Sequence, residues 1–327
     1  MRIVCDTYIP FITEAVRQEW PQVEIIPLKP EQIVPSAIQE ADALIVRTRT
    51  KVNEQLLAGS KVRLVCTATI GFDHIDTDYC DFHGIRWMSC PGCNAQAVCN
   101  YIEEALIEVR AKGTIGIVGV GHVGSLVAQM AERKGFTVLL NDPPKGIGVS
   151  LDEIAENSDF ITFHVPLAGA LNTERCADRI QTKYHTWHLC DASFLARCKP
   201  GALIINAARG GVVDEQALLR SGHPYILDTW ENEPDIHPDV LRHALFASMH
   251  IAGYSVEGKR NASQMCLNAI ATAFGLPLID ISTSQHLDIS IKKGDSAPGW
   301  LSRISDSLKA HPTDFELLRK AYPLREE

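Results

Sequence analysis

The sequence predicts an α/β protein with two doubly wound parallel-sheet domains, one inserted into the other, and a short C-terminal tail region. Three observations predict it. Short apolar runs alternate with helical patterns along most of the chain, a glycine-rich turn follows one such run near the middle, and two long helices flank a complete strand–helix series. With 327 residues, 46% of them hydrophobic, the chain is long enough for two cores.

The first part of the chain contains four short apolar runs separated by helical patterns. The runs lack the alternation of half-exposed strands, which is typical of parallel strands covered on both faces. Strands are predicted at residues 2–5, 23–28, 43–47 and 62–68, and helices at 12–20 and 53–57. This pattern predicts a flavodoxin-like sheet with helices on both sides.

A long helix is predicted over residues 94–112, where Val98, Tyr101 and Ala105 recur at spacings of three and four. A second series of strands and helices follows it. Its strands are predicted at residues 114–120, 137–141, 160–165, 202–207, 225–228 and 244–249. Six strands with crossover helices make a complete doubly wound sheet, which is expected as an inserted domain.

A second long helix, predicted over residues 257–274, returns the chain to the first sheet. The expected organisation is a substrate domain of residues 1–93 and 255–280 and a nucleotide-binding domain of residues 94–254. Residues 281–327 form a tail that ends in an amphipathic helix around residues 315–322. The tail is too small for a core of its own, so we expect it to pack on the body or on a partner subunit.

Charge and cysteine usage exclude several classes of protein. The formal net charge of −9 argues against a nucleic-acid or anionic-membrane surface. No apolar run approaches the roughly 20 residues of a membrane span, and the amino terminus has no apolar export region, so a cytoplasmic protein is expected. Cys90 and Cys93 lack a second metal half-site, so we predict structural thiols and no metal centre.

The motif Gly119-Val120-Gly121-His122-Val123-Gly124 follows a predicted strand and opens a predicted helix. In a Rossmann-type domain, the first glycine makes the turn, the second admits the pyrophosphate and the third lets helix and strand pack. Asp142 ends the next strand, where a carboxylate binds the ribose hydroxyls and favours NAD over NADP. Lys145 leaves room for NADP, although two prolines between it and Asp142 limit its reach. A structural glycine turn is the alternative.

Three candidate catalytic residues follow successive strands of the same predicted sheet. Arg209 comes after the strand at 202–207, Glu233 after the strand at 225–228, and His250 after the strand at 244–249. An arginine can hold a carboxylate, and a histidine oriented by a carboxylate can exchange a proton. Each residue alone is as compatible with a surface loop. Their shared position at carboxyl ends of strands, beside the glycine turn, favours a catalytic group.

The segments 206–215 and 228–234 together with His250 resemble the D-2-hydroxyacid dehydrogenase family. Within that family, five further segments are similar to the branch of erythronate-4-phosphate dehydrogenases in pyridoxal phosphate biosynthesis; they are residues 46–52, 67–74, 90–95, 250–259 and 315–326. The resemblance spans nearly the whole chain. It implies NAD-dependent oxidation of 4-phospho-D-erythronate to the 2-oxo acid by a homodimer.

The resemblance also implies the role of individual residues. Arg209 would hold the substrate carboxylate, His250 would be the acid/base, and Glu233 would orient His250. Asp228 would meet the nicotinamide carboxamide. Further cofactor contacts are expected from His122, Val123, His164, Ala207 and Gly253.

The substrate phosphate requires cations, which the resemblance places mainly in the first domain. Arg47, Thr48 and Arg49 follow the strand at 43–47, and alternation puts the two arginines on one face and Thr48 on the other. Thr69, Tyr254 and Lys259 are further candidates for substrate binding. A solvated basic rim is the alternative reading of the cluster.

The chain departs from the branch in three places, and other functions stay open. The segment 168–185 is longer than the branch pattern and the segment 217–225 is shorter, which bears on the cofactor site, and the tail is shorter, which bears on the dimer. A related dehydrogenase of phosphoglycerate or of hydroxypyruvate and glyoxylate is one alternative. A catalytically silent NAD-sensing module is the other, although nucleotide binding alone does not require Arg209, Glu233 and His250.

Overall fold

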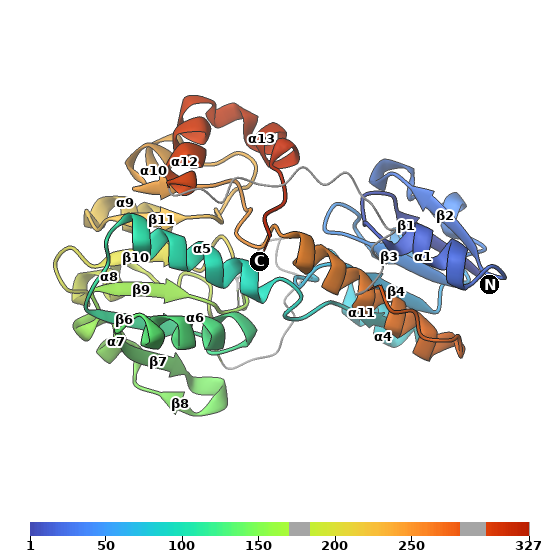
Figure 1. Cartoon of the computed structure of the whole chain (residues 1–327), viewed down its shortest axis with the longest axis horizontal. Helices are drawn as coiled ribbons and strands as arrows, with labels where there is room; N and C mark the ends of the chain where they lie inside the picture. Colours follow the sequence, from blue (N-terminus) through green and yellow to red (C-terminus); the bar gives the residue numbers. More distant parts are fainter. Residues whose placement is uncertain (170–183, 282–298, 327) are drawn as a thin grey trace. The chain divides into compact units, whose positions relative to one another are not determined.

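The computed structural model describes residues 1–169, 184–281 and 299–326 (Figure 1). The chain divides into two compact units. Unit 1 consists of Met1–Asn94 and Ser255–Ile291, and unit 2 consists of Ala95–Tyr254 and Lys292–Glu327. The larger part of unit 2, Ala95–Tyr254, is thus inserted between the two parts of unit 1, and within the described residues the chain crosses between units at Asn94–Ala95 and Tyr254–Ser255. Most of the segment 168–185 lies outside the described residues.

Unit 1 contains a five-stranded parallel sheet in the order β2-β1-β3-β4-β5. The strands are β1 Arg2–Asp6, β2 Glu24–Leu28, β3 Ala43–Val46, β4 Leu64–Thr67 and β5 Arg86–Met88. The helices are α1 Ile12–Glu19, α2 Pro35–Ile38, α3 Glu54–Leu57, α4 Thr77–Phe82 and α11 Val256–Phe274. Along β1, Ile3 and Cys5 enter one hydrophobic cluster and Val4 enters another. Both faces of the sheet are therefore buried, which explains the unbroken apolar runs.

Unit 2 contains a seven-stranded sheet in the order β12-β11-β10-β9-β6-β7-β8. The strands are β6 Thr114–Val118, β7 Thr137–Asp142, β8 Ile147–Gly148, β9 Phe160–Phe163, β10 Leu203–Asn206, β11 Tyr225–Leu227 and β12 Phe246–Ala247. The helices between Ala95 and Tyr254 are α5 Ala95–Glu108, α6 His122–Arg133, α7 Leu151–Asn157, α8 Ala192–Arg197, α9 Glu215–Ser221 and α10 Pro238–His243. All pairs are parallel except β7 with β8.

The predicted α/β class with parallel sheets is confirmed, whereas several element bounds were wrong. The helix predicted to reach residue 112 ends at Glu108, and Arg110 adopts a left-handed φ of 53° soon after. The strand predicted over residues 244–249 is limited to Phe246–Ala247. The edge strands β5 and β8 were not predicted because they are short and partly exposed, so they lack a continuous apolar pattern.

The described part of the tail belongs to unit 2. Helix α12 (Trp300–Ala310), which was not predicted, and α13 (Phe315–Ala321) contribute Trp300, Leu301, Leu308 and Phe315 to its core. Glu108 at the end of α5 accepts hydrogen bonds from the backbone N–H groups of Leu301 and Ser302. A carboxylate at the amino end of α12 satisfies groups that the helix itself leaves without a partner.

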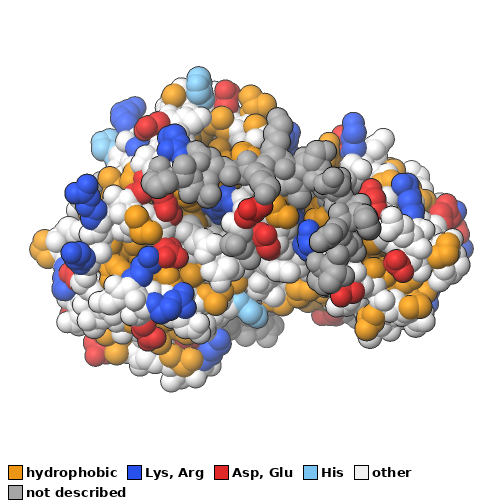
Figure 2. All heavy atoms as spheres, viewed as in Figure 1, with side chains coloured by type: hydrophobic (Ala, Val, Ile, Leu, Met, Phe, Trp, Pro, Cys, Tyr) orange, Lys and Arg blue, Asp and Glu red, His pale blue; other side chains and the backbone are white. Residues whose placement is uncertain are grey.

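The surface carries charges of both signs. Acidic and basic side chains are interspersed over the viewed face of each unit (Figure 2). Among the described helices, none combines the length and the apolar character that a membrane crossing requires.

Candidate active site

The glycine turn of unit 2 lies between the end of β6 and the start of α6. Gly119 has a left-handed φ of 91°, and a Cβ there would lie 2.6 Å from the carbonyl oxygen of His164. A Cβ at Gly124 would lie 1.9 Å from the carbonyl oxygen of Gly119. At Gly121, the N-cap of α6, a Cβ would meet nothing within 4 Å. The first and third glycines thus allow close packing, and the second leaves open space at a helix amino terminus.

Asp142 lies beside this turn, at the end of β7. Its carboxylate accepts the backbone N–H of Val120 at 2.8 Å, and the residue is 8% exposed. Lys145 also reaches the turn, because its Nζ donates to the carbonyl oxygen of Val120 at 2.7 Å. The expectation that Pro143 and Pro144 limit the reach of Lys145 was therefore wrong as far as the turn is concerned.

The turn fits a dinucleotide such as NAD. Open space at Gly121 would admit the pyrophosphate, and the first turn of α6, which includes His122 and Val123, presents backbone N–H groups to it. His164 follows β9, and burial lowers the pKa of its imidazole to about 3, so the ring is neutral. Its Nε2 lies 3.1 Å from Oγ1 of Thr162.

Glu233 and His250 form a hydrogen-bonded pair at the carboxyl ends of β11 and β12. Nδ1 of His250 donates to Oε2 of Glu233 at 2.8 Å and lies 3.1 Å from Oε1. Burial alone would raise the pKa of Glu233, but the charge and hydrogen bond of His250 and the N–H of Trp230 hold it below its usual value. The pair fixes which nitrogen of His250 faces Glu233 and leaves Nε2 to meet a substrate.

Asp228 holds the backbone that carries His250. Its carboxylate accepts hydrogen bonds from Oγ of Ser248 at 2.6 Å and from the N–H groups of Ile251 and Ala252 at 2.8 and 2.9 Å. The residue is 1% exposed. The three donors belong to residues on either side of His250, so Asp228 supports the backbone that carries it. The expected contact of Asp228 with the nicotinamide carboxamide stays a prediction.

Arg209 lies in a turn after β10, and the residue is half-buried. The side chain of Asn206 donates to the carbonyl oxygen of Arg209 at 2.8 Å and accepts from the N–H of Ala208 at 3.1 Å. Ala207 is part of the same turn and is half-buried. A Cβ at Gly210 would lie 1.8 Å from the carbonyl oxygen of Trp230. The turn that carries Arg209 therefore packs directly against the segment that carries Glu233.

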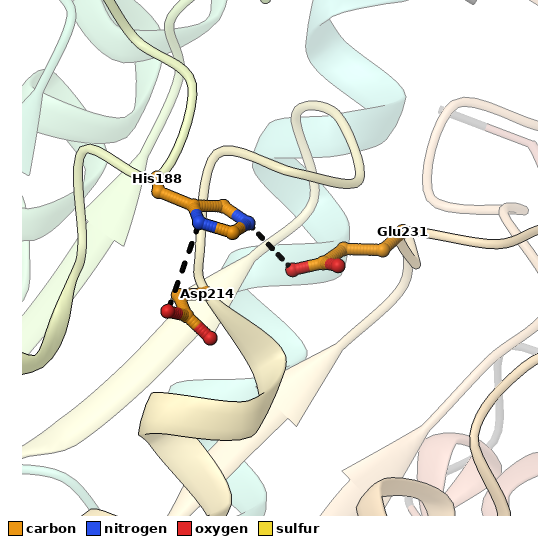
Figure 3. A group of neighbouring side chains, drawn as sticks. All are labelled: His188, Asp214 and Glu231. Atoms are coloured by element: carbon orange, nitrogen blue, oxygen red, sulfur yellow. Dashed lines mark hydrogen bonds and ion pairs between the residues drawn. The ribbon is translucent and has the colours of Figure 1, made fainter. Parts of the chain in front are cut away.

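A second group of titratable residues lies beside both segments. Nε2 of His188 lies 3.0 Å from Glu231, and Nδ1 lies 3.7 Å from Asp214 (Figure 3). In the described part of the chain, this is the group whose ligand atoms could surround a metal ion. However, Glu231 and Asp214 approach opposite edges of the imidazole ring, so a single metal ion could not bridge the ring to both carboxylates. The geometry is that of an imidazole held between two carboxylates.

The residues expected to bind the substrate phosphate are distributed over both units. In unit 1, Nε of Arg47 donates to Asp6 at 2.8 Å and Nη2 does so at 3.3 Å, while Asp6 is fully buried. This ion pair engages much of the guanidinium that was expected to face the phosphate, whereas Thr48 and Arg49 are exposed. Thr69 Oγ1 lies 2.7 Å from Oγ1 of Thr67 and donates to the carbonyl oxygen of Gly71.

The remaining substrate candidates are Lys259, near the start of α11 in unit 1, and Tyr254 at the end of a segment of unit 2. Gly253, expected at the cofactor, precedes Tyr254 and is half-buried. The phenolic oxygen of Tyr254 accepts a hydrogen bond from Nε of Arg319 on α13 at 3.0 Å. Arg319 also acts on Glu233 through its charge. The tail therefore contributes to the surroundings of the predicted catalytic pair.

The sequence analysis did not single out His188, Asp214, Glu215, Glu231 or Arg319. All three acidic residues stand inside the segments 206–215 and 228–234 that it did use, so their positions beside Arg209 and Glu233 were available as a signal. Arg319 stands inside the segment 315–326, but nothing in the sequence places that segment near Glu233, and His188 lies outside all of these segments.

Comparison with known proteins identifies relatives of the whole chain. Residues 101–252 match the model of the NAD-binding domain of D-isomer specific 2-hydroxyacid dehydrogenases. Erythronate-4-phosphate dehydrogenase from Bacteroides fragilis is 43% identical, covering 100% of this chain and 97% of that one. The enzyme of that name from Bacteroides thetaiotaomicron is 41% identical, with the same coverage. The NAD-bound structure of 3-phosphoglycerate dehydrogenase from Entamoeba histolytica has a TM-score of 0.66 at 25% identity, covering 86% and 98% of the two chains.

Proposed function

Because the chain belongs to the erythronate-4-phosphate dehydrogenase branch of the D-2-hydroxyacid dehydrogenases, we propose that it oxidises 4-phospho-D-erythronate to 3-hydroxy-2-oxo-4-phosphooxybutanoate, a step of pyridoxal phosphate biosynthesis, with NAD as cofactor. The observation that carries the chemistry is the Glu233–His250 pair, with Nδ1 and Oε2 2.8 Å apart. The similarity to full-length relatives supports the choice of substrate.

The residues of unit 2 supply the proton transfer and the substrate carboxylate site. Bound NAD supplies the acceptor for the hydride that leaves C2 of the hydroxyacid. Nε2 of His250 takes the proton of the C2 hydroxyl group, and the carboxylate of Glu233 stabilises the imidazolium that forms. The guanidinium of Arg209 pairs with the substrate carboxylate, for which its planar fork is well shaped. Unit 2 is thus proposed as the NAD-binding domain.

Unit 1 is proposed as the substrate domain. Arg49 and Thr48 lie exposed after β3 and are proposed contacts of the phosphate, and Asp6 engages two nitrogens of Arg47. Arginine forms strong bidentate contacts with phosphate. Arg47, Thr69, Tyr254 and Lys259 remain proposed substrate residues. We also propose a cytoplasmic homodimer; the described cysteines are free and buried, as in a reducing compartment.

The test is NADH formation by the purified protein with NAD and 4-phospho-D-erythronate. 3-Phospho-D-glycerate is run in parallel, and D-erythronate without its phosphate is the matched control. A 2-oxo acid is added so that tightly held NADH can turn over. The proposal expects the highest kcat/KM with 4-phospho-D-erythronate. A preference for phosphoglycerate would move the chain to another branch, and NAD binding without oxidation of any acid would support a silent NAD-sensing module.

A further inference from the structure

His188 contacts both segments that carry the proposed catalytic residues. Its backbone N–H donates to the carbonyl oxygen of Gly211 at 2.6 Å, in the turn that follows Arg209. Its side chain donates through Nε2 to Oε1 of Glu231 at 3.0 Å, two residues before Glu233. The ring also stacks on Trp187, and a Cβ at Gly211 would lie 2.4 Å from the Trp187 ring. One residue therefore connects the Arg209 turn to the Glu233 segment.

The backbone of His188 adopts an unfavourable conformation in order to make these contacts. Its φ is 49°, in the left-handed region that residues with a Cβ seldom occupy. Such a conformation is energetically unfavourable and persists where surrounding contacts determine it. The contacts here are the hydrogen bond to Gly211, the hydrogen bond to Glu231 and the approach of Nδ1 to Oδ2 of Asp214 at 3.7 Å.

Glu231 transmits the contact to neighbouring backbone. Its N–H donates to Oε1 of Glu215 at 2.7 Å, and its own Oε1 accepts the N–H of Glu215 at 3.1 Å as well as Nε2 of His188. The two glutamates are therefore joined by a reciprocal pair of hydrogen bonds. Glu215 is 5% exposed, so this link between the start of α9 and the loop after β11 is shielded from water.

The loop after β11 leads directly from Glu231 to the catalytic pair. The N–H of Trp230 donates to Oε1 of Glu233 at 2.9 Å, and its indole Nε1 donates to the carbonyl oxygen of Ser248 at 2.8 Å. A shift of Glu231 would move Trp230 and, through it, the carboxylate that orients His250. A shift of the Gly211 carbonyl would move the turn that holds Arg209.

We propose that His188 is a positioning residue of the dehydrogenase reaction, which fixes the Arg209 turn relative to the Glu233–His250 pair through Gly211 and Glu231. This inference rests on the proposed function, because it assigns Arg209 and His250 their roles. The substrate carboxylate and the C2 hydroxyl group are adjacent in a 2-hydroxyacid. The two groups that bind them must therefore be held at a fixed separation, and His188 links the backbone segments that carry Arg209 and Glu233.

The test replaces His188 with leucine and with glutamine. Leucine removes both side-chain contacts, and glutamine keeps an N–H within reach of Glu231. H188L is expected to lower kcat by about tenfold to hundredfold, as small misplacements of reacting groups do. The KM for NAD is expected to stay within about twofold of wild type, because the glycine turn is unchanged. H188Q is expected to recover most of kcat. H243L, at an exposed histidine of α10, is the matched control and keeps wild-type kcat.

Two further measurements separate positioning from folding and from the substrate assignment. In a double-mutant cycle, the losses of kcat in H188L and E231A should be less than additive, because both changes break the contact between His188 and Glu231. Hydrogen exchange of the Glu231 N–H, which requires no substrate, should accelerate in H188L and not in H243L. Unchanged kcat in H188L, equal losses in H188L and H188Q, or unchanged exchange would overturn the proposal. An inactive wild type with accelerated exchange in H188L would refute the substrate while leaving the structural link.

Discussion

Replacing Glu215 by glutamine tests the electrostatics beside the candidate active site. Burial raises the pKa of Glu215 from its ordinary value of 4.5 to about 7, and the negative charges of Glu231, Glu233 and Asp214 add to the effect, while the N–H of Glu231 opposes it. One pKa unit corresponds to about 1.4 kcal/mol. The shift therefore corresponds to a cost of about 3 kcal/mol when Glu215 is ionised in the folded protein.

The sign of the pH dependence follows from this raised pKa. Between about pH 4.5 and pH 7 the folded protein holds a proton on Glu215 that the unfolded chain releases. The contribution of Glu215 to stability is thus fully present below pH 4.5 and is lost as the pH rises through about 7. A glutamine has no such titration, and its amide oxygen can still accept the N–H of Glu231. The E215Q variant should gain stability relative to wild type as the pH rises, by about 3 kcal/mol at pH 8.

The assay is urea-induced unfolding of wild type and E215Q at half-unit steps from pH 5 to pH 8, followed by tryptophan fluorescence. The comparison uses the change in the free energy of unfolding with pH, so a constant effect of the substitution cancels. E153Q provides a flat control over this range: hydrogen bonds from Ser150 hold the pKa of the exposed Glu153 below its ordinary value of 4.5, so this carboxyl is ionised in both the folded and the unfolded chain and the difference from wild type should not change with pH. Parallel curves for wild type and E215Q would refute the electrostatic reasoning.

Two further predictions concern the cofactor and the proton transfer. Gly121→Ala should keep the wild-type melting temperature, because its Cβ meets nothing in the folded protein, but should lose NAD affinity in a fluorescence titration, because the Cβ takes the space proposed for the pyrophosphate. Gly124→Ala should lower the melting temperature, because its Cβ would meet the carbonyl oxygen of Gly119. Equal stability of the two variants would contradict this. His250→Ala should lower kcat by about 10²–10⁴-fold in the NADH assay, the usual contribution of a general acid/base, and near-wild-type turnover would exclude that role.

The parts of the molecule that the sequence predicted are those in which local pattern and topology agree. Unbroken apolar runs predicted strands covered on both faces, and the parallel order then put the glycine turn, Arg209, Glu233 and His250 at carboxyl ends of one sheet. The spacing of the glycines predicted the turn and the start of α6 without reference to other parts of the chain. These features depend on residues close in sequence, so pattern alone identifies them.

The parts that the sequence did not predict depend on partners distant in the chain. Arg47 pairs with Asp6, 41 residues away, which alters the reading of the basic cluster after β3. The burial of Asp228 depends on donors more than 20 positions away, which no periodicity indicates. Helix α12 was missed because its amino end is completed by Glu108, far from it in sequence. In each case the side chain alone was compatible with a surface position.

The segments that carry Arg209, Glu233 and His250 lie outside regular secondary structure, and polar side chains such as those of Asn206 and Asp228 hold them there. His250 itself has a left-handed φ of 58°, and Asp228 fixes the backbone on both sides of it through Ser248 and Ile251. An unfavourable backbone conformation persists where its neighbours determine it. Asp228 supplies that constraint for His250, as Glu231 does for His188. Removing such a carboxylate should release the loop while the sheet stays folded. Its loss should therefore lower kcat strongly and the free energy of unfolding only slightly.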